Sequence, residues 1–131
     1  MEAKYDAATR FDALLTSLTT RCLVEVKSST LQLESGAASF PDAVTTRGQK
    51  HLQTLMHAVT QGDAACQLYL VMREGAVTFT PAHPIDPTYT HLLTQAHQAG
   101  VAVLVYQAAF TRAADGTPTA LSLGKPLQVV L

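Results

Sequence analysis

Three charged residues have the types and spacing of a metal-dependent acidic site. Asp12 lies in one apolar segment, and Glu25 and Lys27 lie two residues apart in the next. Phosphodiester cleavage requires carboxylates that hold a divalent metal, an aligned water and stabilisation of the phosphate charge. Asp12 and Glu25 can hold Mg²⁺ or Mn²⁺, together with the backbone carbonyl of Val26. Lys27 can serve the water or the phosphate, so the group predicts a catalytic site.

The strand pattern around Glu25 and Lys27 also has a simpler explanation. Residues 21–31 alternate, so Glu25 and Lys27 share one face while Val24 and Val26 share the other. This alternation is equally typical of an ordinary strand with one solvated face, which is the commoner case for so short a motif. Taken alone, the motif therefore leaves both interpretations open.

A second polar group lies in the first half of a predicted helix over residues 43–61. Arg47, Lys50 and His51 share a polar face there. A solvated basic face is the usual explanation, but a phosphate-contacting patch near a helix N-terminus is the functional one. Gln49 is expected to orient a metal ligand. The opposite face carries an apolar stripe of Leu52, Leu55, Met56 and Val59.

The elements that must position these residues alternate between strands and helices. Strands over residues 11–17 and 21–31, separated by Thr19 and Thr20, predict a β-hairpin. A loop over residues 34–41 follows, and Pro41 and Asp42 are expected to start the first helix. Gly62 is expected to end that helix.

The second half of the chain repeats the pattern of strand and helix. Asp86 is expected to cap a second helix and Gly100 to stop it. The remaining expectations are a buried strand over 64–73, a short strand over 77–80, a helix over 88–98, a strand over 101–107, a turn at Asp115-Gly116 and a final strand over 127–131. This order predicts an α/β fold in one domain over residues 1–131, with helices flanking a mixed central sheet.

Composition narrows the class of protein. The 131 residues are 47% hydrophobic, enough for a packed core, and the formal net charge of -1 argues against a globally basic nucleic-acid binder. Cys22 and Cys66 lie apart in apolar runs, which favours two free thiols in a reducing compartment. No segment has the length of a membrane helix, and the N-terminus has no signal-peptide core. A soluble cytoplasmic protein without a membrane partner is expected.

Three sequence blocks resemble the sugar fermentation stimulation protein A family. The blocks are TRFDALL (residues 9–15), CLVEVKSSTL (residues 22–31) and FPDAVTTRGQKHL (residues 40–52), with Ile85-Asp86-Pro87 and Gly100-Val101 before a strand ending in Tyr106 as further matches. The resemblance covers essentially the whole chain. Members of the family carry an N-terminal domain resembling an OB-fold barrel ahead of this region, and the resemblance predicts that this domain is absent from residues 1–131.

The resemblance implies a restriction-endonuclease-like PD-(D/E)XK fold that binds DNA and is linked to regulation of sugar (maltose) metabolism. Asp12 matches the metal-binding aspartate of that motif, Glu25 and Lys27 match its E-x-K, and Glu2 matches an acidic residue before the first strand.

Three functions remain open from the sequence. The first is a metal-dependent endo- or exonuclease acting on DNA, and the second is a DNA-binding regulator without cleavage. The third is an interaction module with a solvated acidic face. An exposed sheet edge beside the C-terminal strand would also allow a homodimer.

Overall fold

The computed structural model describes the backbone of residues 3–4, 10–11, 13–16 and 21–131, with side chains from residue 21 onward except at 121. Glu2 and Asp12, two residues of the predicted site, lie outside this part. Within it no helix is long and apolar enough to cross a lipid bilayer.

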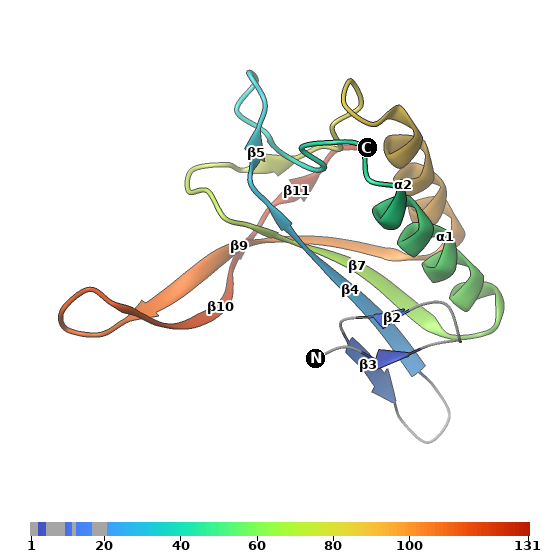
Figure 1. Cartoon of the computed structure of the whole chain (residues 1–131), viewed down its shortest axis with the longest axis horizontal. Helices are drawn as coiled ribbons and strands as arrows, with labels where there is room; N and C mark the ends of the chain where they lie inside the picture. The colour runs from blue at the N-terminus through green and yellow to red at the C-terminus, as the bar shows by residue number, and fades with distance from the viewer. Residues whose placement is uncertain (1–2, 5–9, 12, 17–20) are drawn as a thin grey trace.

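The main sheet is mixed, as the sequence predicts, with five strands in the order β10-β9-β7-β4-β3 (Figure 1). The three central strands are parallel to one another, and the two edge strands run antiparallel to their neighbours. The strands are β3 (Ala13–Thr16), β4 (Arg21–Ser29), β7 (Ala64–Val71), β9 (Ala102–Arg112) and β10 (Pro118–Pro126). The predicted hairpin is present, since β3 and β4 pair from Ala13 opposite Val24 to Thr16 opposite Arg21.

A second, smaller sheet was not predicted from the sequence. Its four strands follow the order β11-β8-β6-β5. They are β5 (Leu31–Gln32), β6 (Ala38–Ser39), β8 (Thr78–Phe79) and β11 (Gln128–Val129), and a separate pair joins β1 (Ala3–Lys4) to β2 (Arg10–Phe11). The prediction that residues 34–41 form only a loop is therefore wrong. The Ser39 hydroxyl donates to the Thr80 carbonyl at 2.5 Å, and Ser29 donates to the Ser39 carbonyl at 2.6 Å, which joins the two sheets.

Strands β9 and β10 reach further than expected. The sequence predicts a strand over 101–107 and no strand between 118 and 126, whereas β9 continues to Arg112 and returns as β10 through the predicted turn at Asp115-Gly116. The two strands extend from the body as an arm (Figure 1).

Helices α1 (Thr46–Thr60) and α2 (Pro87–Ala99) lie side by side against one face of the main sheet (Figure 1). The predicted start of α1 near residue 43 is wrong, because Thr45 is the N-cap and its hydroxyl accepts from the Gly48 N–H at 3.0 Å. The stops are as predicted, since Gly62 and Gly100 adopt the positive φ that ends a helix.

The core lies between these helices and the sheet face that they cover. Leu52 and Leu55 of α1 and Leu93 of α2 are fully buried against Leu23 and Val105 of the sheet. An aromatic cluster extends this core toward the small sheet, where the rings of Tyr69 and Phe79 stack with centroids 4.5 Å apart. Residues 23, 25 and 27 of β4 all point into this helix-covered layer.

The buried carboxylate of Asp86 joins the N-termini of both helices. It caps α2, as predicted, by accepting from the Tyr89 N–H at 2.9 Å, and it also accepts from the Thr45 N–H at 2.9 Å and from the Gln49 amide at 3.0 Å. Burial raises the pKa of Asp86, but these hydrogen bonds outweigh burial and hold the pKa below its usual value. The two helices are thus fixed to one ionised group.

Gly48 is required by close packing at the same junction. A Cβ atom there would lie 2.8 Å from Cγ2 of Thr45 and 3.1 Å from Cε2 of Tyr89. The glycine costs about 1 kcal/mol of helix propensity relative to alanine. It allows α1 to approach α2 more closely than any other residue would.

Replacing Asp86 with alanine is expected to lower the free energy of unfolding by about 3 kcal/mol, because two backbone donors and one amide lose a charged acceptor. Since the folded pKa is depressed, this contribution is present above the unfolded value of about 3.9 and is lost as pH falls through the folded pKa. Urea unfolding at several pH values measures both effects. Asp42→Ala, an exposed site before α1, should change stability by less than about 0.5 kcal/mol, and an equal loss there would contradict the assignment.

Gly48→Ala is expected to destabilise the fold by about 1–2 kcal/mol, although alanine is the better helix former. Adding Thr45→Ser removes Cγ2 but keeps the capping hydroxyl, so the double variant should recover part of the loss. Thermal unfolding of the three proteins tests this, and a more stable Gly48→Ala protein would show that packing does not require the glycine.

Candidate active site under helix α1

Glu25 and Lys27 lie on the face of β4 that α1 covers, as the alternation of the strand requires. Nζ of Lys27 is 3.0 Å from Oε1 of Glu25, and the Glu25 residue is 4% exposed. The explanation that this is an ordinary solvated strand face is therefore excluded by the structure, because an exposed face would not place an ion pair under a helix. The sequence motif forms a buried polar group at the helix–sheet interface.

His51 completes this polar group from α1. Its Nδ1 lies 3.0 Å from Oε1 of Glu25 and 3.1 Å from Nζ of Lys27, and the residue is 5% exposed. The prediction that His51 shares the polar face of Arg47 and Lys50 is wrong, because His51 is buried with Gly48 and Leu52 on the side of α1 that faces the sheet. Glu25, Lys27 and His51 are named the polar triad below.

The hydrogen-bonding capacity of the triad allows two arrangements. In one imidazole tautomer Nδ1–H donates to Glu25 while Lys27 donates to the same carboxylate separately. In the other, Nδ1 accepts from the Lys27 ammonium. Either way the carboxylate keeps at least one charged donor.

The carboxyl group of Glu25 is ionised at neutral pH. Burial raises its pKa, but the hydrogen bond from His51 and the charge and hydrogen bond of Lys27 outweigh burial, so the pKa lies below its usual value. A buried anion is therefore maintained next to a cation and an imidazole, which is the electrostatic arrangement of a functional site.

Gln67 is a buried polar residue that the sequence prediction missed. It lies opposite Glu25 on β7, is fully buried, and its amide nitrogen donates to the Glu25 carbonyl at 3.2 Å. Its Oε1 atom is buried without a hydrogen-bond partner among the described atoms. A glutamine within the otherwise apolar run of β7 was the sequence signal that would have identified it.

Two tyrosines close the inner side of the site. The hydroxyls of Tyr69, opposite Lys27 on β7, and Tyr89 of α2 hydrogen-bond to each other. Burial raises the pKa of both, and the negative charges of Glu25 and Asp86 raise that of Tyr89 further. Both phenols therefore stay neutral and form a rigid polar link between the sheet and α2. Tyrosine on a core face gives no sequence signal that separates this role from ordinary packing.

The other predicted residues lie outside the triad. Arg47 and Lys50 are exposed on α1, one turn apart, which agrees with the predicted basic face. Gln49 donates its amide to Asp86, so in the structure it orients the helix junction, and its predicted role toward a metal ligand stays a prediction. Val26 lies between the two charged residues of β4 on the opposite face.

The donors present are of the type that Mg²⁺ or Mn²⁺ prefers. Glu25 supplies an ionised carboxylate, and the amide oxygen of Gln67 is a buried acceptor with no hydrogen-bond partner in the described part of the chain. The described side chains contain no group of three or more His, Cys, Asp or Glu residues that could hold a metal. A complete site would need the carboxylate of Asp12, which the described residues do not include.

Comparisons with known proteins identify the fold and the family. A family model described as "Sugar fermentation stimulation protein RE domain" matches residues 1–114. The chain is 49% identical over 132 residues to a sugar fermentation stimulation protein homolog of Shewanella piezotolerans, covering 99% of this chain and 53% of that protein. It is 44% identical over 130 residues to the homolog of Citrifermentans bemidjiense, with the same coverage of 99% and 53%.

A solved structure shares this fold. SfsA of Pyrococcus furiosus, in complex with Ca²⁺, superimposes with a TM-score of 0.81 at 26% identity, over 95% of this chain and 51% of that one. The chain thus spans about half the length of the relatives it matches. From the family match and these identities, the chain belongs to the sugar fermentation stimulation protein family and corresponds to its RE domain.

Proposed function

We propose that this chain is a DNA-binding, metal-dependent nuclease domain in which Asp12, Glu25 and Lys27 carry the chemistry. The observation that supports this most directly is the pair on β4, because Glu25 is buried, ionised and 3.0 Å from Lys27 under α1. Maintaining an ion pair there costs desolvation energy that an apolar pair would avoid. Catalysis supplies a reason for that cost.

Each residue has a distinct role in this proposal. Bound Mg²⁺ or Mn²⁺ would activate a water and neutralise charge on the scissile phosphate. Glu25, with Asp12 and the Val26 carbonyl, would hold the ion, and a Ca²⁺ complex of the Pyrococcus furiosus relative supports a divalent-cation site in the family. Lys27 would orient the water or stabilise the phosphate, and His51 fixes the Glu25 carboxylate.

DNA would approach along the exposed side of α1. Arg47 and Lys50 project there, near the N-terminus of the helix, where the helix dipole favours phosphate. His51 is buried and reaches the triad, so it would act on the carboxylate and leave phosphate contact to the two exposed cations.

A DNA-binding regulator of sugar metabolism without cleavage is the second candidate. One observation favours it, because Oε1 of Glu25 lies 3.0 Å from both Nζ of Lys27 and Nδ1 of His51, so protein groups already surround this oxygen. The name of the family's curated members also refers to sugar fermentation.

The cleavage proposal is tested with single- and double-stranded DNA in the presence of Mn²⁺ or Mg²⁺. Lys27→Ala and Asp12→Ala should each lower the cleavage rate by about 10²–10⁴-fold, because each removes a group that acts in the transition state. Activity that survives both substitutions would come from a contaminant. DNA binding without cleavage in the wild-type protein would support the second candidate instead.

Metal binding has a separate readout in the absence of DNA. Calorimetric titration with Mn²⁺ should show weaker binding to Glu25→Gln by about tenfold or more, since that variant keeps the shape and loses the charge. Glu34→Gln, at an exposed loop position, is the matched control and should bind as the wild type does.

The proposed DNA contact predicts a change in salt dependence. Each phosphate contact contributes about 0.9 to the slope of log affinity against log salt concentration on duplex DNA. Arg47→Ala with Lys50→Ala should therefore flatten the slope by about 2, measured by fluorescence anisotropy. Arg73→Ala, an exposed arginine after β7, should leave it unchanged, and an unaltered slope in the double variant would remove α1 from the interface.

A further inference from the structure

The arm leaves one edge of β9 without a neighbouring strand in the described structure. β7 ends at Val71, which pairs with Gln107, while β9 continues to Arg112. From Ala108 to Arg112 the strand is paired with β10 on one side only. This segment is named the free edge, and unpaired strand edges are templates for pairing with another chain.

Backbone groups of the free edge point outward. The Leu127 N–H donates to the Val105 carbonyl at 2.9 Å, so the backbone groups of Val105 face the β10 side. Because these groups alternate along a strand, those of Ala108, Phe110 and Arg112 face the opposite side. The free edge therefore offers N–H and C=O groups over five residues.

The opposite edge of the arm is protected, in contrast to the free edge. β10 begins and ends with proline, carries Lys125 near its end and shows two register shifts against β9. Proline, lysine and bulges are the devices by which natural sheets prevent edge pairing. The free edge has no proline, lysine or bulge, and its one charged residue, Arg112, lies at its end. The arm is thus open to strand addition on its β9 side.

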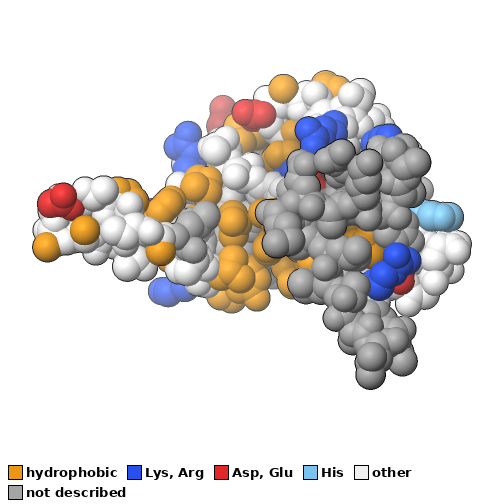
Figure 2. All heavy atoms as spheres, turned by 60° about the horizontal axis from the view of Figure 1, so that its bottom comes forward, with side chains coloured by type: hydrophobic (Ala, Val, Ile, Leu, Met, Phe, Trp, Pro, Cys, Tyr) orange, Lys and Arg blue, Asp and Glu red, His pale blue; other side chains and the backbone are white. Residues whose placement is uncertain are grey.

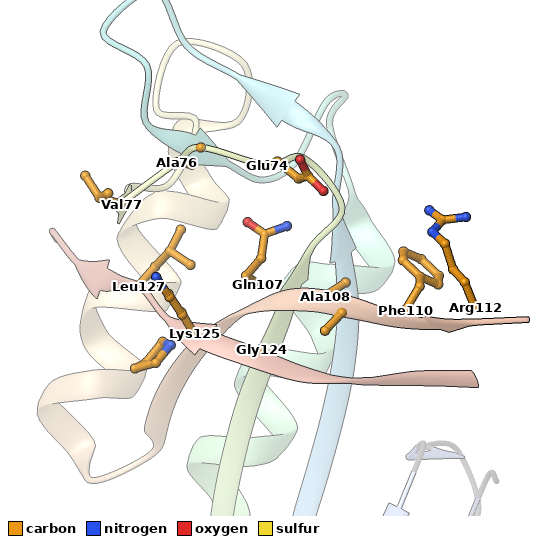
Figure 3. Close-up of a pocket in the computed structure, with 13 residues that line it drawn as sticks. Glu74, Ala76, Val77, Gln107, Ala108, Phe110, Arg112, Gly124, Lys125 and Leu127 are labelled. Atoms are coloured by element: carbon orange, nitrogen blue, oxygen red, sulfur yellow. The ribbon is translucent and has the colours of Figure 1, made fainter. Parts of the chain in front are cut away.

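A groove with a volume of about 660 Å³ lies between the arm and the loop after β7, and its lining includes residues of the free edge and residues 124–127 around the end of β10 (Figure 3). Glu74 of that loop lies above Ala108 near the middle of the groove, Arg112 lies at one end, and Val77, Leu127 and Lys125 lie at the other (Figure 3). Phe110 stands between them with 43% of its surface exposed. The free edge therefore has an acidic side chain of the loop near Ala108, an exposed aromatic ring at its centre and a cation in Arg112 at its end.

We propose that the free edge pairs with the free edge of a second copy of this chain, next to this groove. Antiparallel pairing about a two-fold axis at Phe110 places the two phenyl rings against each other. It also brings Arg112 of each copy opposite Ala108 of the other, beside Glu74. The contact forms twice by symmetry and joins the two main sheets into one.

The charge pattern favours this partner over an unrelated peptide. A segment that pairs with the free edge meets Glu74 of the loop near Ala108 and the ring of Phe110 at the centre, and the free edge itself supplies a cation and an apolar side chain for these positions in Arg112 and Phe110. Apolar side chains also continue from the body onto the arm (Figure 2). Aromatic cross-strand pairs and opposite charges each stabilise such pairing.

The oligomeric state of the full chain, without DNA or metal, tests the proposal independently of nuclease function. Sedimentation equilibrium of the wild type should give a concentration-dependent dimer. Phe110→Pro removes an outward N–H that β10 does not use and should raise the dimer dissociation constant by about tenfold or more. A wild type that stays monomeric at every concentration overturns the proposal.

Charge reversal provides a test that misfolding cannot imitate. Arg112→Glu alone and Glu74→Arg alone should each weaken the dimer by about tenfold, because each places like charges together. The double variant restores opposite charges and should recover wild-type association. Arg73→Glu, outside the groove, should have no effect. A dimer that resists Phe110→Pro, or a double variant that is not rescued, shows that the copies do not meet through this edge.

Discussion

The burial of Glu25 is the constraint on which the site depends. An ionised carboxylate between a helix and a sheet is strongly unfavourable unless charged donors compensate it. β4 supplies one donor two residues along the same face, in Lys27, and α1 supplies the other, in His51. The sheet alone cannot supply both polar neighbours of the Glu25 carboxylate. The position of α1 along its own axis therefore decides whether the triad forms.

That position is set by the helix junction. Asp86 accepts from the backbone just before α1 and from the backbone of the first turn of α2, which fixes both helix starts to a single carboxylate. Gly48 then lets Tyr89 pack against α1, and His51 follows one turn later on the same side. Because the hydroxyl of Tyr89 also reaches Tyr69 beside Lys27, the junction and the triad form one connected polar layer within the core.

The elements with strong local signals were predictable from the sequence. The β3–β4 hairpin, the two helices and the parallel strands β7 and β9 follow from alternation, apolar stripes and glycine stops. The start of α1 was not predictable in this way. Proline and aspartate, which stand at positions 41 and 42, are common in the first turn of a helix, whereas the chain uses Thr45 as the cap. Strand β6 was missed because two residues have no periodicity, and only pairing with β5 and β8 makes them a strand.

The candidate site was only partly predictable from the sequence. Strand alternation placed Glu25 and Lys27 correctly on one face, but it could not say which face α1 covers. His51 was assigned to the polar side by its type, although its spacing from Gly48, Leu52 and Leu55 already matched the buried stripe. A histidine on an apolar stripe is informative when a buried charge lies across from it, and that charge is visible only in the fold.

The arm and the triad lie at different parts of the same sheet, and this separation determines how dimer formation would affect the two sites. The free edge belongs to the distal end of β9, whereas the triad lies under α1 on β4, two strands across from β9 (Figure 1). Pairing of two arms would therefore complete neither triad and would contribute no residue to the partner's site. Its effect would be geometric, because a continuous sheet holds the two sites at a fixed separation. Two domains linked in this way, each making the proposed DNA contact through α1, would engage one DNA molecule with an avidity set by that spacing.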